Sequence, residues 1–352
     1  MNSRLRIGII GAGGNTRAKH IPEFKKISGV EVSVVCNRTM ESSQRVAKEF
    51  GLPFATTSAR DIIESPDIDA ICIGTWPNMH AKLAVAALRA GKHVLTEARM
   101  ARNLAEAEMM LEESQQRANL VAQIVPAPMS LPFDATIIEL LQRGTLGPIR
   151  EVLLTATTDS VADSALPLTW RQDLACSGKN TLYLGIYYEM VLRWLGQGVT
   201  SVIADAAIFT KERKDEDGVP EPTTIPESVT VLGSYAPASG SMLAEGARLV
   251  AHFSGVERSG ARAEIRLNGS KAGLRLDLLK NELWLTRAGE KEQLVTIAPE
   301  KRGAWHVEAD FVDSIRTGRG VRLTDFATGV KYMQFTEAVW DSWHTGGRRV
   351  TL

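Results

Sequence analysis

The sequence lacks a charge excess, a long apolar run and a cysteine framework. Its 41 basic residues balance 41 acidic ones, so nothing favours binding to nucleic acid or to an anionic membrane surface. No uninterrupted apolar stretch reaches the ~18 residues of a membrane span, and the first residues do not resemble a signal peptide. The three cysteines, at unrelated spacings, predict neither disulfides nor a metal site. We expect a cytoplasmic protein that acts on a small molecule and needs no metal.

Two kinds of pattern divide the 352 residues. In the first third, short apolar runs alternate with amphipathic helical stretches, which predicts βαβ units and a parallel sheet. The expected strands are Leu5–Ile10, Val30–Cys36, Ala70–Ile73, Lys92–Thr96 and Leu120–Val125. After a proline cluster at 126–132 most runs are β-rich, and a helix over about Gly178–Leu195 interrupts them. Further helices are expected over Phe133–Arg143, Val307–Thr317 and Asp325–His344. We predict an α/β protein with a parallel-sheet domain over residues 1–125, followed by an α/β domain with an open, mostly antiparallel sheet over residues 126–352.

A glycine-rich loop follows the first expected strand and precedes a helical pattern. It reads Gly11-Ala12-Gly13-Gly14-Asn15-Thr16. Gly11 permits a tight turn, and Gly13 lets backbone N–H groups approach a diphosphate at the helix N-terminus. Thr16 stands at the third position of the dinucleotide fingerprint, which is glycine or alanine, and we expect it to cost some closeness between helix and strand. Strand, loop, helix and second strand in this order predict a Rossmann domain, with this loop at the cofactor.

The second strand ends at Asn37 and Arg38, where the adenosine ribose should lie. An acidic residue here would accept hydrogen bonds from the ribose 2′-hydroxyl and repel a 2′-phosphate. Asn37 is neutral, and Arg38 could pair with a phosphate. Arg38 could also be a solvated surface residue or stack on adenine. The two residues favour NADP slightly over NAD.

Two further segments are more specific than the glycine loop. One reads T-W-P-N-M-H over residues 75–80, and the other reads A-G-K-H-V-L-T-E over residues 90–97. They resemble the T-P-x-x-x-H-like segment and the A-G-K-H-V-x-x-E-K-P segment of the Gfo/Idh/MocA family of sugar and polyol oxidoreductases. The resemblance extends to Trp170-Arg171, to residues 265–277 and to the C-terminal segment, and so covers nearly the whole chain.

The resemblance implies a nicotinamide-dependent dehydrogenase or reductase that acts on a CH–OH group of a sugar, polyol or sugar-derived carbonyl. It implies that residues 126–352 bind the substrate and form a homodimer or homotetramer through their sheet. The residues expected on the nicotinamide side are Thr75, Trp76, Pro77, Asn78, His80 and Glu97. His80 could instead be a helix-start histidine satisfied by the backbone. Trp170 and Arg171 could stack on a sugar face and bind its hydroxyls, although a core tryptophan fits equally well.

The sequence departs from the family at the residues that handle the proton. The family's E-K-P reads E-A-R at 97–99, and its D-x-G-x-H reads Y-L-G-I-Y at 183–187. A group near the substrate oxygen must still accept the hydroxyl proton. Lys179, Tyr183 and Tyr187 are spaced i, i+4 and i+8, so in a helix they would share one stripe.

We therefore expect Tyr187, or as second choice Tyr183, to be the catalytic acid–base residue. The ordinary pKa of tyrosine, ~10, is too high for a base at neutral pH. A nearby cation, Lys179 or Arg99, would have to lower it by favouring the phenolate. The alternative is that both tyrosines only pack in the interior.

Two other functions stay open at this point. A glycosidase with tightly bound NAD could cleave its substrate by transient oxidation, elimination and re-reduction, with a tyrosine as the base. A non-catalytic, cofactor-bound sensor could have lost the family's lysine.

Overall fold

The computed structural model describes residues 4–237 and 239–352, and the chain folds into two compact units. The first unit contains the chain up to Pro126 and also residues His306–Val330. The second contains Ala127–Trp305 and Lys331–Leu352. The expected division placed everything after residue 125 in the second domain, whereas a C-terminal helix returns to the first unit. Within the described residues, no helix is both long enough and apolar enough to cross a bilayer.

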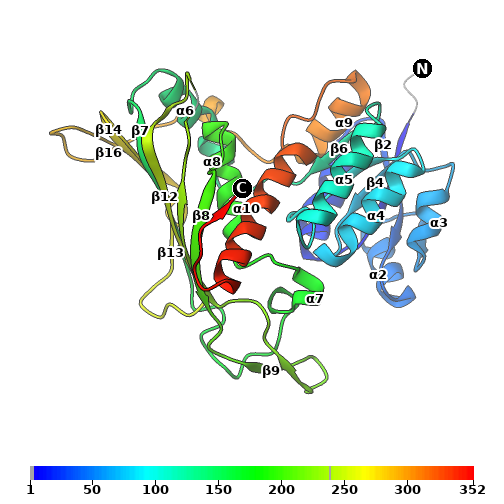
Figure 1. Cartoon of the computed structure of the whole chain (residues 1–352). Helices are drawn as coiled ribbons and strands as arrows, with labels where there is room; N and C mark the ends of the chain where they lie inside the picture. Colours follow the sequence, from blue (N-terminus) through cyan, green and yellow to red (C-terminus); the bar gives the residue numbers. More distant parts are fainter. Residues whose placement is uncertain (1–3, 238) are drawn as a thin grey trace. The chain divides into compact units, whose positions relative to one another are not determined.

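The first unit is built on a six-stranded parallel sheet in the order β3-β2-β1-β4-β5-β6 (Figure 1). Its strands are β1 (Leu5–Ile10), β2 (Val30–Cys36), β3 (Phe54–Thr56), β4 (Ala70–Ile73), β5 (His93–Thr96) and β6 (Ala122–Ile124). Its helices are α1 (Ile21–Lys26), α2 (Met40–Phe50), α3 (Ala59–Glu64), α4 (Pro77–Arg89), α5 (Leu104–Gln116) and α9 (Val307–Thr317). Strands β1 and β4 are almost fully buried, as expected where helices cover both faces of a parallel sheet. This Rossmann sheet confirms the predicted fold of the first domain.

Helix α9, orange in Figure 1, joins the first unit through aromatic packing. Phe311 of α9 meets Phe24 of α1 edge to face at a ring distance of 6.3 Å, and both rings are fully buried. Gln123 of β6 donates from its side-chain amide to the carbonyl of Val307 at 3.2 Å, which holds the start of α9 beside the sheet. The Rossmann core is therefore completed by a segment almost 200 residues further along the chain.

The second unit contains a nine-stranded sheet in the order β16-β15-β14-β13-β7-β12-β11-β8-β17. These strands are β7 (Ile149–Thr157), β8 (Ser201–Ala207), β11 (Ser228–Ser234), β12 (Leu243–Ser254), β13 (Arg262–Gly269), β14 (Ala272–Asp277), β15 (Glu282–Arg287), β16 (Gln293–Leu294) and β17 (Val350–Thr351). All neighbours in the sheet are antiparallel except β7 and β12, which run parallel. The open, mostly antiparallel sheet is thus confirmed.

Helices cover one side of this sheet, because Tyr187 of α8 packs on Phe253 of β12. Tyr188 of the same helix stacks on Phe335 of α10 at 3.8 Å, so α8 and α10 also pack on one another. The helices assigned here are α6 (Leu131–Gln142), the short α7 (Leu174–Ser177), α8 (Leu184–Leu195) and residues 331–344 of α10 (Phe326–His344). A separate hairpin is formed by β9 (Glu212–Lys214) and β10 (Pro220–Pro222).

Helix α8 starts later than the sequence pattern suggested. It begins at Leu184 rather than near Gly178. The chain turns before it, because Leu182 adopts a positive φ of 46° and the Asn180 side-chain amide donates to the carbonyl of Ser177 at 2.6 Å. A side chain that hydrogen-bonds to nearby backbone competes with helix formation. Lys179 therefore lies outside the helix that carries Tyr187.

Candidate functional site

The glycine loop is pressed tightly against the carboxyl ends of the central strands. Gly11 adopts a φ of 87°, and its N–H donates to the carbonyl of Cys36 at the end of β2 at 2.8 Å. A Cβ placed on Gly11 would lie only 2.7 Å from the backbone nitrogen of Thr75. Both the backbone conformation and the space therefore require glycine here.

Thr16, the departure from the glycine fingerprint, fastens the loop to the sheet. Its side chain is buried, and its hydroxyl donates to the carbonyl of Gly11 at 3.1 Å. Gly74, just after β4, makes room for this hydroxyl, because a Cβ on Gly74 would lie 2.0 Å from Thr16 Oγ1. The expected loss of closeness does not occur, because Gly74, directly after the neighbouring strand β4, takes the place of the glycine that the fingerprint lacks at position 16.

The front of the loop is open where a diphosphate would lie. A Cβ on Gly14 would meet no atom within 4 Å, and one on Gly13 would meet only the carbonyl of Gly74, at 3.8 Å. A helical segment follows directly, as a π-helical turn over Thr16–His20 that continues into α1. Exposed backbone N–H groups at a helix N-terminus attract phosphate. The residues present therefore fit a dinucleotide.

The end of β2 presents a neutral residue and a cation. The Asn37 side chain is used within the protein: its Oδ1 accepts from the N–H of Ala12 at 2.7 Å, and its Nδ2 donates to Ser42 Oγ at 3.0 Å. Arg38 is exposed and makes no side-chain hydrogen bond or ion pair with any described residue. Asn37 therefore shapes the loop, while the Arg38 guanidinium remains available to a ligand.

The loop after β4 carries the expected nicotinamide-side residues. Trp76 is 40% exposed and directly precedes α4, whose first residue is the buried Pro77. Thr75 and Asn78 are partly exposed, and the Oδ1 atom of Asn78 is buried without a hydrogen-bond partner in the described chain.

His80 lies between two backbone segments of the first unit. It is fully buried, its Nδ1 lies 2.9 Å from the carbonyl of Arg99, and its Nε2 lies 3.0 Å from the carbonyl of Thr75. Burial lowers the pKa of His80 despite these carbonyls. Both ring nitrogens are thus occupied by backbone, which matches the structural alternative for this histidine.

Glu97 follows β5 and contacts the glycine loop. Its Oε1 accepts from the side-chain amide of Asn15 at 2.5 Å and lies 3.0 Å from Nε2 of His20. Burial would raise the pKa of Glu97, but the His20 and Asn15 hydrogen bonds outweigh it and lower the pKa. His20 in turn pairs through Nδ1 with Glu308 of α9. Sequence reasoning missed His20 and Glu308, since no local pattern connects residues 288 positions apart.

In the second unit, four of the expected residues form a cluster. The guanidinium of Arg171 lies over the Trp170 ring at 4.2 Å. Partial desolvation lowers the pKa of Arg171, and its electrostatic interaction with Tyr183 opposes that shift. The ring of Tyr183 lies 6.4 Å from that of Tyr187, which packs edge to face on Phe253 at 5.4 Å.

The structure corrects the expected roles within this cluster. Tyr187 is 3% exposed, and burial, followed by the charge of Tyr183, raises its pKa above the ordinary value. Lys179 does not support it, because its ammonium pairs with Glu337 and Asp341 of α10. The expectation that a cation lowers the pKa of Tyr187 is therefore wrong. Tyr183 is 46% exposed and has Arg171 as its cation. Arg99, the other expected cation, is buried in the first unit.

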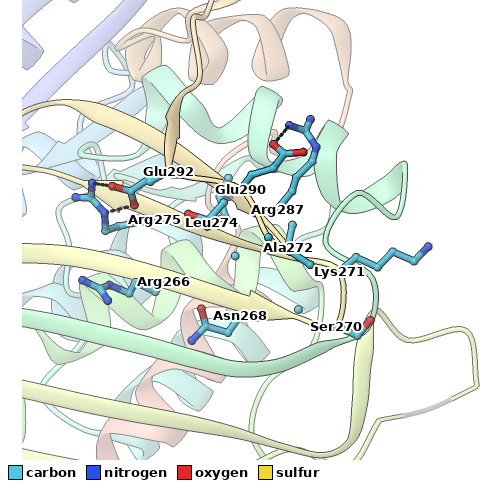
Figure 2. Close-up of a pocket in the computed structure, with 15 residues that line it drawn as sticks. Arg266, Asn268, Ser270, Lys271, Ala272, Leu274, Arg275, Arg287, Glu290 and Glu292 are labelled. Atoms are coloured by element: carbon cyan, nitrogen blue, oxygen red, sulfur yellow. Dashed lines mark hydrogen bonds and ion pairs between the residues drawn. The ribbon is translucent and has the colours of Figure 1, made fainter.

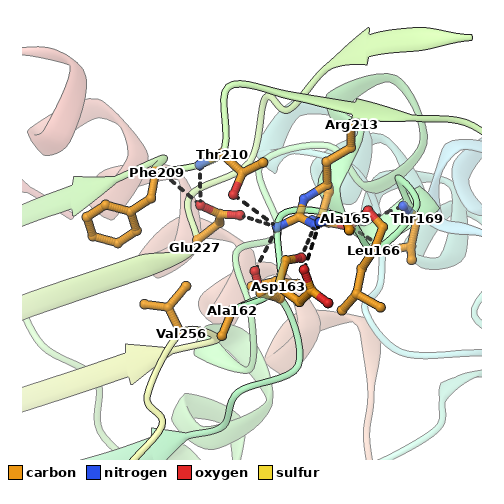
Figure 3. A network of polar contacts seen from close by, with 12 residues as sticks. Ala162, Asp163, Ala165, Leu166, Thr169, Phe209, Thr210, Arg213, Glu227 and Val256 are labelled. Carbon is orange, nitrogen blue, oxygen red and sulfur yellow. Dashed lines mark hydrogen bonds and ion pairs between the residues drawn. The ribbon is translucent and has the colours of Figure 1, made fainter.

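A buried arginine holds the loop that leads to Trp170 (Figure 3). The side chain of Arg213 is fully buried and pairs with Glu227 at 2.8 Å. Its guanidinium also donates, at 2.7, 2.8 and 3.1 Å, to the carbonyl oxygens of Val161, Asp163 and Leu166. Arg213, which lies in β9, therefore fixes the course of the backbone before the Trp170 turn.

The hollow drawn in Figure 2 lies elsewhere in the second unit. It measures about 770 Å³ and is lined by β13, β14, β15, the turn between β13 and β14, and the segment that follows β15. Its arginines are neutralised by neighbouring acids, as in the pairs Arg275–Glu292 at 2.5 Å and Arg287–Glu290 at 3.7 Å. None of the expected cofactor or substrate residues lines it.

Together, the parallel sheet and the open glycine loop define a dinucleotide-binding α/β protein. Family models place it more closely. Residues 5–124 match the oxidoreductase family with an NAD-binding Rossmann fold, and residues 135–275 match the GFO/IDH/MocA C-terminal domain. The chain belongs to the Gfo/Idh/MocA family, as its motifs indicated.

Individual relatives share parts of the chain. It is 35% identical over 112 residues to 4-carboxy-2-hydroxymuconate-6-semialdehyde dehydrogenase of Sphingobium sp., covering 32% of this chain and 35% of the relative. It is 29% identical over 222 residues to levoglucosan dehydrogenase of Pseudarthrobacter phenanthrenivorans, covering 61% and 57%. The chain thus spans less than two thirds of either curated relative. A solved levoglucosan dehydrogenase in complex with NADH and levoglucosan has the same fold, with a TM-score of 0.85, 22% identity and 99% of both chains covered.

The contact between Gly74 and the glycine loop yields a prediction. In Gly74→Ala, the new Cβ would lie 2.3 Å from the carbonyl of Gly11, so the loop must move. We expect a loss of about 1–3 kcal/mol in unfolding free energy and weaker NAD(P)H binding. Urea unfolding and fluorescence titration measure these effects. Gly320→Ala, where a Cβ meets no atom within 4 Å, should change neither. Equal behaviour of the two variants would contradict the prediction.

Proposed function

We propose that the protein is an NAD(P)-dependent oxidoreductase that transfers a hydride between nicotinamide and a sugar, polyol or sugar-derived carbonyl. The observation that carries the proposal is the open cradle at Gly13 and Gly14, followed directly by a helix. Family membership and the dehydrogenase relatives support the same reaction class. The three cysteines are free thiols, which fits the cytoplasmic location that we include in this proposal.

The bound nicotinamide would supply the hydride acceptor or donor. The cofactor would be held by the glycine loop, by Arg38 on the ribose side, and on the nicotinamide side by residues 75–78 at the start of α4, as the sequence predicts. Trp170 offers an aromatic face for a sugar ring, and Arg171 offers donors to its hydroxyls.

Proton transfer requires a group that can reach the substrate oxygen, and we assign it to Tyr183. Loss of hydride from a carbinol carbon must be matched by loss of the hydroxyl proton, which the Tyr183 oxygen would accept. Arg171 is the cation that interacts electrostatically with Tyr183. Tyr187 is the second candidate, disfavoured by its burial. The family's usual lysine and histidine are replaced here, so Tyr183 would take over their role in proton transfer.

We further propose a preference for NADP over NAD. Asn37 carries no charge that would repel a 2′-phosphate, and its amide is already engaged by Ala12 and Ser42. The exposed Arg38 is the cation nearest to it in sequence, and a guanidinium pairs with phosphate in two parallel hydrogen bonds.

We also propose that the protein forms a homodimer through the uncovered face of its large sheet. The strand register aligns one row of apolar side chains across four neighbouring strands: Ile203, Leu232, Val250 and Leu153. Leu232, at the middle of the row, is 51% exposed. The row continues across β13 and β14 as Arg266 and Arg275, which are paired with acidic neighbours. An apolar strip flanked by balanced charges suits a second protein surface.

The activity is tested with purified protein and a panel of sugars and polyols. Mass spectrometry first identifies any co-purified cofactor, and absorbance at the nicotinamide band then follows net NAD(P)H formation. Net turnover supports the oxidoreductase. Glycoside cleavage without net cofactor change would instead support the glycosidase, and cofactor binding with neither reaction would support the sensor.

With an active substrate, Tyr183→Phe tests the proton acceptor. We expect kcat to fall about 10²–10⁴-fold, because removing the hydroxyl removes the group that takes the proton. Tyr187→Phe, which removes a neighbouring tyrosine hydroxyl within α8, is the matched control and should keep most of the activity. Steady-state rates are measured across a range of pH. If Tyr187→Phe lowers kcat more than Tyr183→Phe does, Tyr187 would be the proton acceptor.

Arg38→Ala tests the cofactor preference. We expect the Kd for NADPH to rise about tenfold or more, since a charge-assisted hydrogen bond is lost, while the Kd for NADH changes little. Arg45→Ala, which removes an exposed arginine of α2 paired with Glu41, is the control. Tighter binding of NADH than NADPH by the unaltered protein would overturn the proposal.

Leu232→Arg tests the oligomer. A charge in the middle of the apolar strip should convert the dimer into a monomer, because burying an unpaired charge at the interface costs free energy. Analytical ultracentrifugation measures this change. Leu279→Arg alters a leucine of similar exposure in the turn after β14 and should leave the dimer intact. A monomeric unaltered protein would contradict the proposal outright.

A further inference from the structure

A buried histidine lies between two carboxylates directly behind the glycine loop. The His20 side chain has no exposed surface, and those of Glu308 and Glu97 are 1% and 16% exposed. Nε2 of His20 lies 3.0 Å from Oε1 of Glu97, and its Nδ1 contacts Oε1 of Glu308. Buried ionisable groups are rare unless they are paired, so this cluster requires an explanation.

Three separate parts of the first unit build this cluster. His20 ends the π-helical turn that follows the glycine loop. Glu97 follows β5, and Glu308 lies in the first turn of α9, where the positive end of the helix dipole favours a carboxylate. The cluster therefore joins the cofactor loop, the end of the sheet and the returning C-terminal helix.

The partners of His20 define its protonation state. A carboxylate only accepts hydrogen bonds, so an imidazole between two of them must donate from both nitrogens, which only the imidazolium can do. Burial opposes this charge, but the hydrogen bonds that His20 donates to Glu308 and Glu97 outweigh it and raise the pKa of His20 to about 9. Two further titratable groups interact with the cluster: His80 of α4, which acts on Glu97, and Cys72 of β4, on which both carboxylates act.

The cluster reaches the cofactor loop through Asn15. Oε1 of Glu97 accepts from both His20 and the Asn15 side-chain amide, at 3.0 and 2.5 Å. Asn15 immediately follows the open glycines at 13 and 14. Without the imidazolium, two neighbouring buried carboxylates would repel one another, and their negative charge would also oppose a diphosphate at the loop.

We propose that His20 is a positioning residue of the cofactor site: as an imidazolium between Glu97 and Glu308, it holds the Glu97 carboxylate, and through it Asn15, in place beside the glycine loop. This inference rests on the proposed cofactor binding. It assigns His20 no contact with the cofactor itself. It makes cofactor affinity dependent on a proton held in the protein interior.

The protonation state is measured directly on the full-length protein. Histidine ring nitrogens are labelled with ¹⁵N, and the His20→Gln spectrum identifies the His20 signals among the six histidines. We expect imidazolium shifts at pH 7.5, where an ordinary histidine is mostly neutral, and a transition near pH 9. A neutral His20 ring at pH 7.5 would overturn the inference. If His20→Gln does not fold, slow-exchanging N–H protons coupled to both ring nitrogens identify the buried imidazolium in the unaltered protein.

Cofactor binding supplies the second measurement. We expect His20→Gln to raise the Kd for NADPH about tenfold, mainly as a higher KM for the cofactor with a smaller change in kcat. Glu308→Gln should weaken binding in the same direction, although Glu308 lies in a different segment of the chain. His344→Gln, at an exposed histidine near the C-terminus, is the matched control and should bind normally.

The pH dependence separates positioning from mere packing. A folded-state pKa above the unfolded value means that His20 stabilises the protein fully below about pH 6.5 and that this stabilisation disappears as the pH rises to about 9. The Kd for NADPH should rise over the upper part of that range, near pH 9, in the unaltered protein and not in His20→Gln. Identical pH profiles for the two proteins would refute the positioning role. Failure of the unaltered protein to bind any pyridine nucleotide would instead refute the proposed function, leaving the NMR result to stand on its own.

Discussion

The close approach of the glycine loop to the ends of β1, β2 and β4 governs the first unit. Gly11 can donate to Cys36 and lie against Thr75 only because neither it nor Gly74 carries a side chain. The hydroxyl of Thr16 then occupies the space left by Gly74 and secures the loop carbonyl. A loop held from behind in this way can leave its front face free of side chains, and an anion site needs such a face.

Polar and charged side chains in the protein interior also hold this loop in place. Asn15, Glu97, His20 and Glu308 form a continuous polar chain from the loop surface to the buried start of α9. Such a network is stable only when every member is satisfied, so each link constrains the next. The two proposals concerning this unit therefore have a common structural basis, because the backbone of the loop and the proton of His20 depend on one packing arrangement.

Local patterns were sufficient for the fold and for the cofactor loop. The glycine spacing, the apolar strands and the A-G-K-H-V-x-x-E string all depend on neighbours in sequence, so they could be interpreted without coordinates. The role of Tyr187 could not be inferred in this way, since it depends on distant segments. Phe253 buries Tyr187, and Lys179 forms ion pairs with Glu337 and Asp341. The break at Leu182 removed the helical stripe on which that expectation was based. The pairing of His20 with Glu308 was hidden for the same reason.

The hydrogen bonds from Arg213 to the loop before Trp170 have a consequence for how the sequence of this protein can change during evolution. The guanidinium holds carbonyl oxygens at residues 161, 163 and 166, and every amino acid carries that oxygen. Side chains along the loop can therefore be exchanged during evolution without loosening the anchor. The segment that leads to Trp170 can therefore keep its backbone course while the side chains that it exposes to solvent vary.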